Sequence, residues 1–119
     1  MKWVLWLNTI AETAIAVGMF STPASFFPGA TGLSASIARA FSFAILAVAF
    51  ISFSVTRPGT SPETLNNALA ILVVYHVLQL IVQFITASTY PPLLIPPVII
   101  HTVFSALIIT YLIRSRRLS

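Results

Sequence analysis

Four ionisable residues interrupt long apolar runs of this 119-residue chain: Glu12, Arg39, His76 and His101. A carboxylate, two imidazoles and a guanidinium can exchange protons, hold the polar head of a ligand or bind a metal ion. Ionisable residues are expensive inside apolar membrane segments, and where they occur they usually mark a functional site. The segments that carry these residues decide which chemistry the chain can support.

The composition is typical of an integral membrane protein. Hydrophobic residues make up 58% of the chain and charged residues only 7%, whereas a soluble domain carries about a quarter charged residues. There is no cysteine, which excludes disulfides and thiolate chemistry. The sequence also has no Gly-rich phosphate loop, serine nucleophile elbow or nucleic-acid-binding module, so we expect no nucleic-acid partner.

Four apolar segments approach the ~20 residues that a helix needs to cross a bilayer. We predict helices over residues 3–20, 33–55, 65–87 and 93–112, separated by breakers rich in Pro, Gly and Ser. The residues Ser61, Pro62 and Glu63 are typical of an N-cap, a first-turn proline and an acidic first turn, so the third helix should start there. The predicted fold class is all-α, a single four-transmembrane-helix bundle over residues 1–119.

The basic residues predict the orientation of this membrane protein. The N-terminus, the middle loop and the C-terminus hold five of the six Lys and Arg residues: Lys2, Arg57, Arg114, Arg116 and Arg117. The other two loops have none. Positive residues concentrate in cytoplasmic loops, so we expect a multi-pass protein with both termini cytoplasmic, in a bacterial inner membrane or an equivalent compartment.

Three of the ionisable residues should lie at similar depth. At 1.5 Å per residue, Glu12 and His76 fall at the centres of their segments and His101 within about two residues of its centre. Arg39 lies about five residues, or ~8 Å, nearer the outer face, where its long side chain can reach Glu12. Helical spacing adds polar or small neighbours to each segment: Asn8, Thr9 and Thr13; Ala35, Ala38, Ser42 and Ala49; Gln79 and Gln83; Ser105. These faces should point into the protein, because polar groups facing lipid are costly.

We therefore predict a buried polar midplane site that binds an apolar or amphipathic small molecule. Its predicted ligand-binding residues are Glu12, Arg39, His76, His101 and Gln79, with Glu12 as the proton-exchanging anion. No catalytic residue, resident metal or cofactor is predicted, and membrane lipids and the small molecule are the expected partners. Several alternatives stay open. They are a proton-coupled small-molecule exporter, a membrane enzyme doing acid–base chemistry on a lipid-soluble substrate, a metal ion held by the two histidines and the Glu12 carboxylate, a haem held by the two histidines, a homodimer, or a structural subunit.

Two family resemblances bear on these predictions. The layout, the loop FFPGATGL and Arg39 in IARAFSF resemble the DoxX-like group of small four-helix membrane proteins. That resemblance implies the four-helix fold, and some members of the group are linked to redox or chaperone roles. The segment IAETAIAVGMF resembles the first helix of small multidrug resistance transporters. Those transporters work as dual-topology dimers and use a first-helix glutamate, which here would be Glu12.

The charge distribution predicts a single orientation, which cysteine labelling can test. In the cysteine-free chain, Ser25→Cys or Ser88→Cys should react with a membrane-impermeant thiol reagent added outside intact cells. Ser119→Cys should react only after the cells are opened, which makes it the internal control. If all three positions react in intact cells, the protein has dual topology and the exporter alternative gains support.

Overall fold

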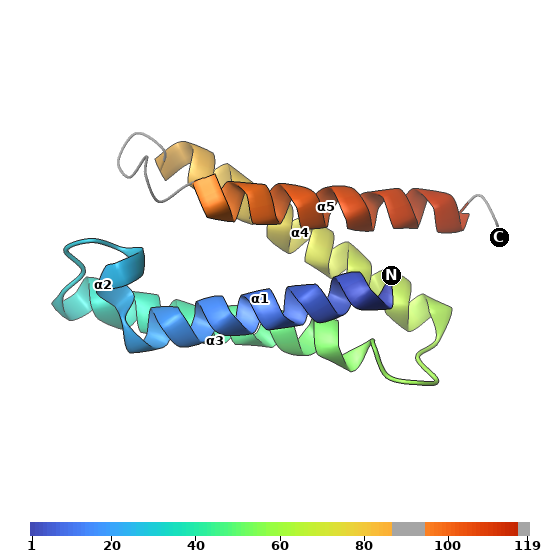
Figure 1. Cartoon of the computed structure of the whole chain (residues 1–119), viewed down its shortest axis with the longest axis horizontal. Helices are drawn as coiled ribbons and strands as arrows, with labels where there is room; N and C mark the ends of the chain where they lie inside the picture. The colour runs from blue at the N-terminus through green and yellow to red at the C-terminus, as the bar shows by residue number, and fades with distance from the viewer. Residues whose placement is uncertain (87–94, 117–119) are drawn as a thin grey trace. The chain divides into compact units, whose positions relative to one another are not determined.

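The computed structural model describes residues 1–86 and 95–116, and every regular element among them is an α-helix. The helices are α1 (Lys2–Ser21), α2 (Pro23–Phe26), α3 (Gly32–Ser54), α4 (Pro62–Thr86) and α5 (Ile95–Arg116) (Figure 1). Four of these helices, all except α2, are long and apolar enough to cross a membrane. The prediction of an all-α chain with four helices of membrane-spanning length is confirmed for this part of the chain.

The helix ends agree with the sequence signals except in α2 and α5. α4 begins at Pro62, and Ser61 Oγ accepts a 3.1 Å hydrogen bond from the backbone N–H of Thr64, as an N-cap does. α5 continues to Arg116, past the predicted end at residue 112. The predicted boundaries at residues 87 and 93, together with Ser88, Arg117 and Ser119, lie outside the described residues.

The chain forms two compact units, Lys2–Arg57 and Pro58–Ser119. In the first unit, α1 and α3 run antiparallel and are joined through α2 (Figure 1). Near one end, Asn8 Nδ2 donates a 2.8 Å hydrogen bond to Ser52 Oγ. The small residues predicted to allow close approach of α3 are all buried: Ala35, Ala38, Ser42 and Ala49.

The short helix α2 was not predicted, and it packs against α1 at a glycine. A Cβ atom at Gly18 would lie 3.0 Å from Cε2 and Cζ of Phe26. A larger residue at this position would push the Phe26 ring away by a few tenths of an ångström, so the glycine allows the ring to lie this close to the α1 backbone. The Phe26 ring also packs on a buried apolar cluster that joins α1 and α3: Ala16, Met19, Ala38 and Ile45.

In the second unit, α4 and α5 lie side by side (Figure 1). Leu69 and Leu72 on α4 and Ile108 on α5 are fully buried. These apolar side chains lie toward the start of α4 and the end of α5, as the antiparallel arrangement requires. The two histidines lie farther along, toward the end of α4 and the start of α5.

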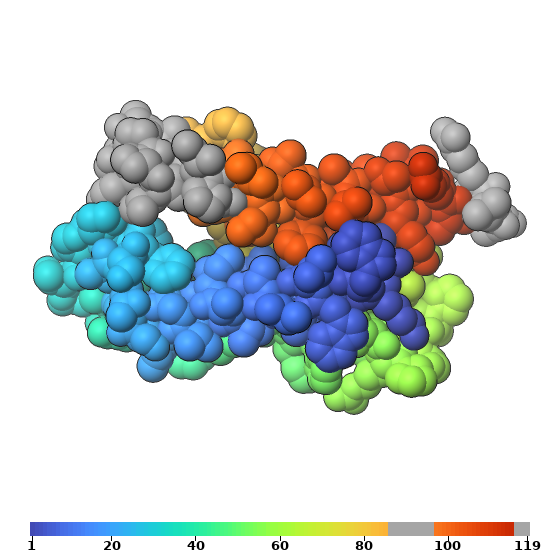
Figure 2. All heavy atoms as spheres, in the orientation of Figure 1, coloured from blue at the N-terminus to red at the C-terminus, as the bar shows by residue number. Residues whose placement is uncertain are grey.

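Large apolar side chains cover the outside of the long helices. Leu33, Phe84 and Ile85 are 76%, 69% and 73% exposed, and many others are similar. Figure 2 shows the outer side chains of α1, in blue, and α5, in orange, as continuous rows along their helices. So many large exposed apolar side chains are unusual on a small soluble monomer. They are what the lipid-facing side of a membrane helix requires.

Candidate functional site

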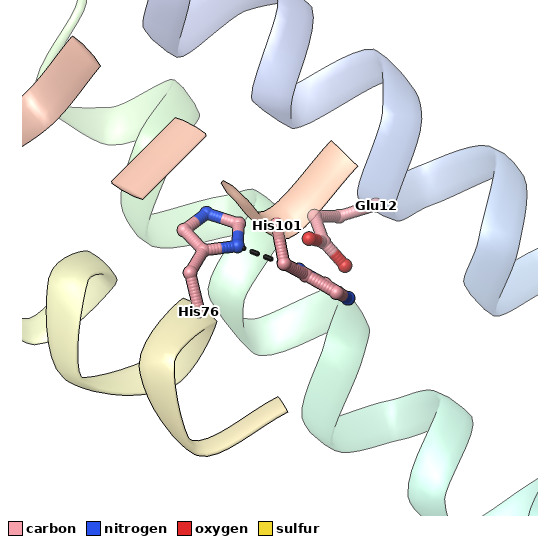
Figure 3. Close-up of side chains that lie close together, drawn as sticks. All are labelled: Glu12, His76 and His101. Atoms are coloured by element: carbon pink, nitrogen blue, oxygen red, sulfur yellow. Dashed lines mark hydrogen bonds between the residues drawn. The ribbon is translucent and has the colours of Figure 1, made fainter. Parts of the chain in front are cut away.

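His76 on α4 and His101 on α5 form a hydrogen-bonded pair within the Pro58–Ser119 unit (Figure 3). Their Nδ1 atoms are 2.8 Å apart, and the exposed fractions of the two side chains are 0% and 4%. Because α4 and α5 run antiparallel, two residues 25 positions apart in sequence meet at the same level. The structure thus brings these two predicted site residues into direct contact.

The bond between the two Nδ1 atoms requires two different tautomers. A neutral imidazole has one N–H and one bare nitrogen, so one Nδ1 must donate and the other must accept. The ring whose Nδ1 accepts carries its own proton on Nε2. The ring whose Nδ1 donates has a bare Nε2. In the neutral pair, one Nε2 atom therefore carries a proton and the other does not, and a single proton lies between the rings.

Two further aromatic rings hold the histidines in place. Phe104 stacks on His76 with ring centroids 5.4 Å apart and an angle of 19° between the ring planes. Tyr75 makes edge contacts with His76 at 5.1 Å and with His101 at 5.9 Å. Neither ring was predicted as part of the site. The sequence contains a signal for Phe104, because it lies three residues after His101 and so on the same helix face. Tyr75 is next to His76 in sequence, and this spacing does not predict a shared helix face.

The separation of the two nitrogens is that of a hydrogen bond. A tetrahedral zinc ion bound at about 2.0–2.1 Å by each Nδ1 would hold these nitrogens roughly 3.3 Å apart. The observed 2.8 Å is shorter and lies within the hydrogen-bond range. Binding one metal ion or haem iron through both Nδ1 atoms would therefore require the rings to move apart, against the packing of Phe104 and Tyr75.

The histidine pair lies away from the middle of α5. His101 is about five residues, or ~7 Å, before the midpoint of Ile95–Arg116. A helix that ended at residue 112, as predicted, would have His101 near its centre. The apolar run actually continues as helix into the basic C-terminal segment, which moves the centre of the span toward the C-terminus.

Glu12, also labelled in Figure 3, belongs to the Lys2–Arg57 unit. It is buried and lies one turn after Asn8 on α1. Thr13, predicted to share this inward face, is exposed, because successive helical residues are rotated by roughly 100°. Gln79 is half-buried, one turn after His76. The predicted roles of Glu12 and Gln79 in ligand binding stay predictions.

Arg39 contacts a different group from the one expected. Its side chain is exposed, and Nε donates a 3.2 Å hydrogen bond to the backbone carbonyl of Phe20. Phe20 lies eight residues, or ~12 Å, along α1 from Glu12. Carbonyls in the last turn of a helix lack a partner within that helix, and a basic side chain can satisfy them. Arg39 therefore caps α1 instead of pairing with Glu12, and its role as a ligand residue stays a prediction.

Comparisons with known proteins assign no family: no family model, curated protein or solved structure matches this chain. The resemblances to the DoxX-like group and to small multidrug resistance transporters stay predictions.

The contact of Arg39 predicts that Glu12→Gln and Arg39→Gln act independently on stability. The Arg39 change should cost about 1 kcal/mol, because it removes one hydrogen bond from an exposed side chain. The double variant should then lose the sum of the two single losses within ~0.5 kcal/mol, measured by reversible unfolding in detergent micelles. A double variant that is clearly more stable than this sum would show that the two side chains interact.

The histidine pair predicts a distinctive nitrogen spectrum. The chain has two histidines, so ¹⁵N-histidine labelling reports this pair alone. At neutral pH, one ring should appear as the Nδ1–H tautomer and the other as the Nε2–H tautomer, with a strongly deshielded shared proton. His101→Ala should remove one ring and the shared-proton signal, which assigns the spectrum. Two Nε2–H tautomers in the unaltered chain would contradict the hydrogen bond.

Proposed function

We propose that the chain is a multi-pass membrane protein that binds a small amphipathic molecule, whose polar head is held by the His76–His101 pair. The observation that carries this proposal is the buried Nδ1–Nδ1 hydrogen bond between two helices of membrane-spanning length. Burying imidazoles among apolar helices is costly unless each polar atom has a partner. The distribution of Lys and Arg supports cytoplasmic termini for this protein.

The donor and acceptor character of the pair indicates the class of ligand. A group that both donates and accepts, such as a hydroxyl, a carboxylic acid or a primary amide, matches one N–H and one bare nitrogen. The rings of Phe104 and Tyr75 suit an apolar body attached to that group. Ser105, one turn after His101, is buried, and its Oγ has no hydrogen-bond partner among the described residues. A ligand group that bonded this hydroxyl would remove the cost of leaving it unsatisfied.

The alternative is a purely structural pair. A polar contact between membrane helices contributes about 0.6 kcal/mol on average. In that case, removing either histidine lowers stability and leaves the binding by the surviving folded protein unchanged. In the binding proposal, the folded variants lose the ligand.

Native mass spectrometry of the full chain, purified in mild detergent, tests the proposal. The unaltered protein should retain a small molecule, and His76→Ala and His101→Ala should each reduce its occupancy about tenfold, because a lost partner for a buried polar group costs about 1–3 kcal/mol. Thr102→Ala, at an exposed position beside His101, is the matched control and should retain the molecule. Circular dichroism and size-exclusion chromatography establish that each variant is folded.

The same experiment extends to the residues predicted from sequence alone. Glu12→Gln and Gln79→Ala should weaken retention if these side chains hold the ligand. The proposal is wrong if the unaltered protein carries no small molecule, or if both histidine variants retain it at the unaltered level.

The shared proton favours proton-coupled export as a second candidate. A proton that binds the bare Nε2 allows the Nδ1 proton of that ring to pass to the other ring, which then releases its own Nε2 proton. One proton enters, one leaves, and the two tautomers exchange. Flux of the retained molecule into proteoliposomes should then follow an imposed pH gradient. Flux that ignores the gradient would exclude proton coupling, and no flux would leave binding as the function.

A further inference from the structure

A groove of about 270 Å³ lies between α1 and α3, entirely within the Lys2–Arg57 unit. Its lining residues are Thr9, Thr13, Leu46, Ala49, Phe50 and Phe53. Thr9 turns its hydroxyl toward the backbone, 2.8 Å from the carbonyl of Leu5 and 3.4 Å from that of Ala49. The small Ala49 side chain and the inward-turned Thr9 hydroxyl leave a largely apolar space. Because Phe50 is 63% exposed, this space opens on the outer surface of the helix pair.

One end of the groove carries a fixed positive charge. Phe53 lines that end, and the Trp6 ring meets it edge-on with centroids 5.5 Å apart. The guanidinium carbon of Arg57 lies 5.6 Å from the centroid of the same Phe53 ring. Such a cation–π contact keeps the guanidinium close to the groove. Lys2 begins the antiparallel α1 and so adds positive charge at this end of the unit.

The groove is short enough to lie within one leaflet of a bilayer. From Leu46 to Phe53 it follows α3 for ~10 Å, and α3 ends at Ser54, so Arg57 comes just after the end of the helix. Half of the ~30 Å hydrocarbon core is roughly 15 Å, which accommodates this stretch. Tryptophan is typical of the boundary between that core and the headgroups, which is where Trp6 would lie. A single phospholipid has the same layout, with an apolar chain below a charged head.

We propose that this groove binds an anionic phospholipid, with one acyl chain along Thr13, Ala49 and Phe53 and the phosphate against Arg57. The apolar lining accepts any acyl chain, so the groove alone does not select among lipids. Arg57 supplies the selection, because a guanidinium pairs with phosphate oxygens through two hydrogen bonds and favours a net negative headgroup. The groove belongs to the Lys2–Arg57 unit alone, so this proposal does not depend on the function proposed for the histidine pair.

A lipid-competition experiment on the full chain tests the charge. The detergent-purified protein is incubated with equimolar phosphatidylglycerol and phosphatidylcholine of identical acyl chains and examined by native mass spectrometry. The unaltered chain should retain phosphatidylglycerol in preference. Arg57→Gln should reduce that preference roughly fivefold, the effect of one basic residue at a membrane surface. Arg114→Gln removes an exposed charge from the other unit and should leave the preference unchanged.

A second pair of variants tests the groove. Thr13→Phe places a ring in the groove and should lower the retention of both lipids, whereas Ala14→Phe adds the same ring at a neighbouring position outside the groove lining. Both positions are exposed, so both variants should fold, as circular dichroism will establish. Equal retention of the two lipids by the unaltered chain overturns the proposal. So does a preference that survives Arg57→Gln, or equal effects of the two Phe variants. A dimer lost only in Thr13→Phe, with lipid retention unchanged, would assign the groove to a second copy of the chain.

Discussion

A polar side chain buried within a membrane-length helix is costly unless it has a partner, and the polar contacts between the helices of each unit reflect that cost. In the first unit, the Asn8 amide bonds to Ser52 and the Arg39 guanidinium to the carbonyl of Phe20. In the second, the two imidazoles bond to each other. Apolar packing tolerates small sliding of one helix along another, whereas a 2.8 Å hydrogen bond does not. These contacts therefore fix the register of α1 against α3 and of α4 against α5.

The sequence predicts the helices well because their causes are local. Length, apolar content and breakers set the four spans, and the Ser61 cap sets the start of α4. The hydrogen-bond partners of the polar residues are harder to predict from the sequence, because they depend on the register between helices. The sequence pattern suggested Glu12 for Arg39, but backbone carbonyls are acceptors that no side-chain pattern reveals. The prediction that Thr13 faces inward was wrong for another reason. The row of polar residues on α1 is wider than the buried face of the helix, so it includes an exposed position.

The Asn8–Ser52 hydrogen bond in the first unit can be compared with the histidine pair in the second. Asn8 and Ser52 join two helices with a neutral amide–hydroxyl bond that cannot titrate in the physiological range. If the only need at the α4–α5 contact were to join two helices, a pair of this kind would meet it. Two imidazoles add properties that joining does not require, namely a movable proton and a second nitrogen on each ring. This difference supports binding or proton exchange at the pair over a purely structural role.

The proton between the rings also connects the two candidate functions. A neutral hydroxyl or amide ligand matches the neutral pair, because one Nε2 donates and the other accepts. A carboxylate ligand has no hydrogen to donate, so it cannot bond to the bare Nε2. An additional proton on that nitrogen turns both Nε2 atoms into donors and balances the negative charge. An anionic ligand would therefore enter the site together with one proton, and binding would become proton-coupled without any further group in the mechanism.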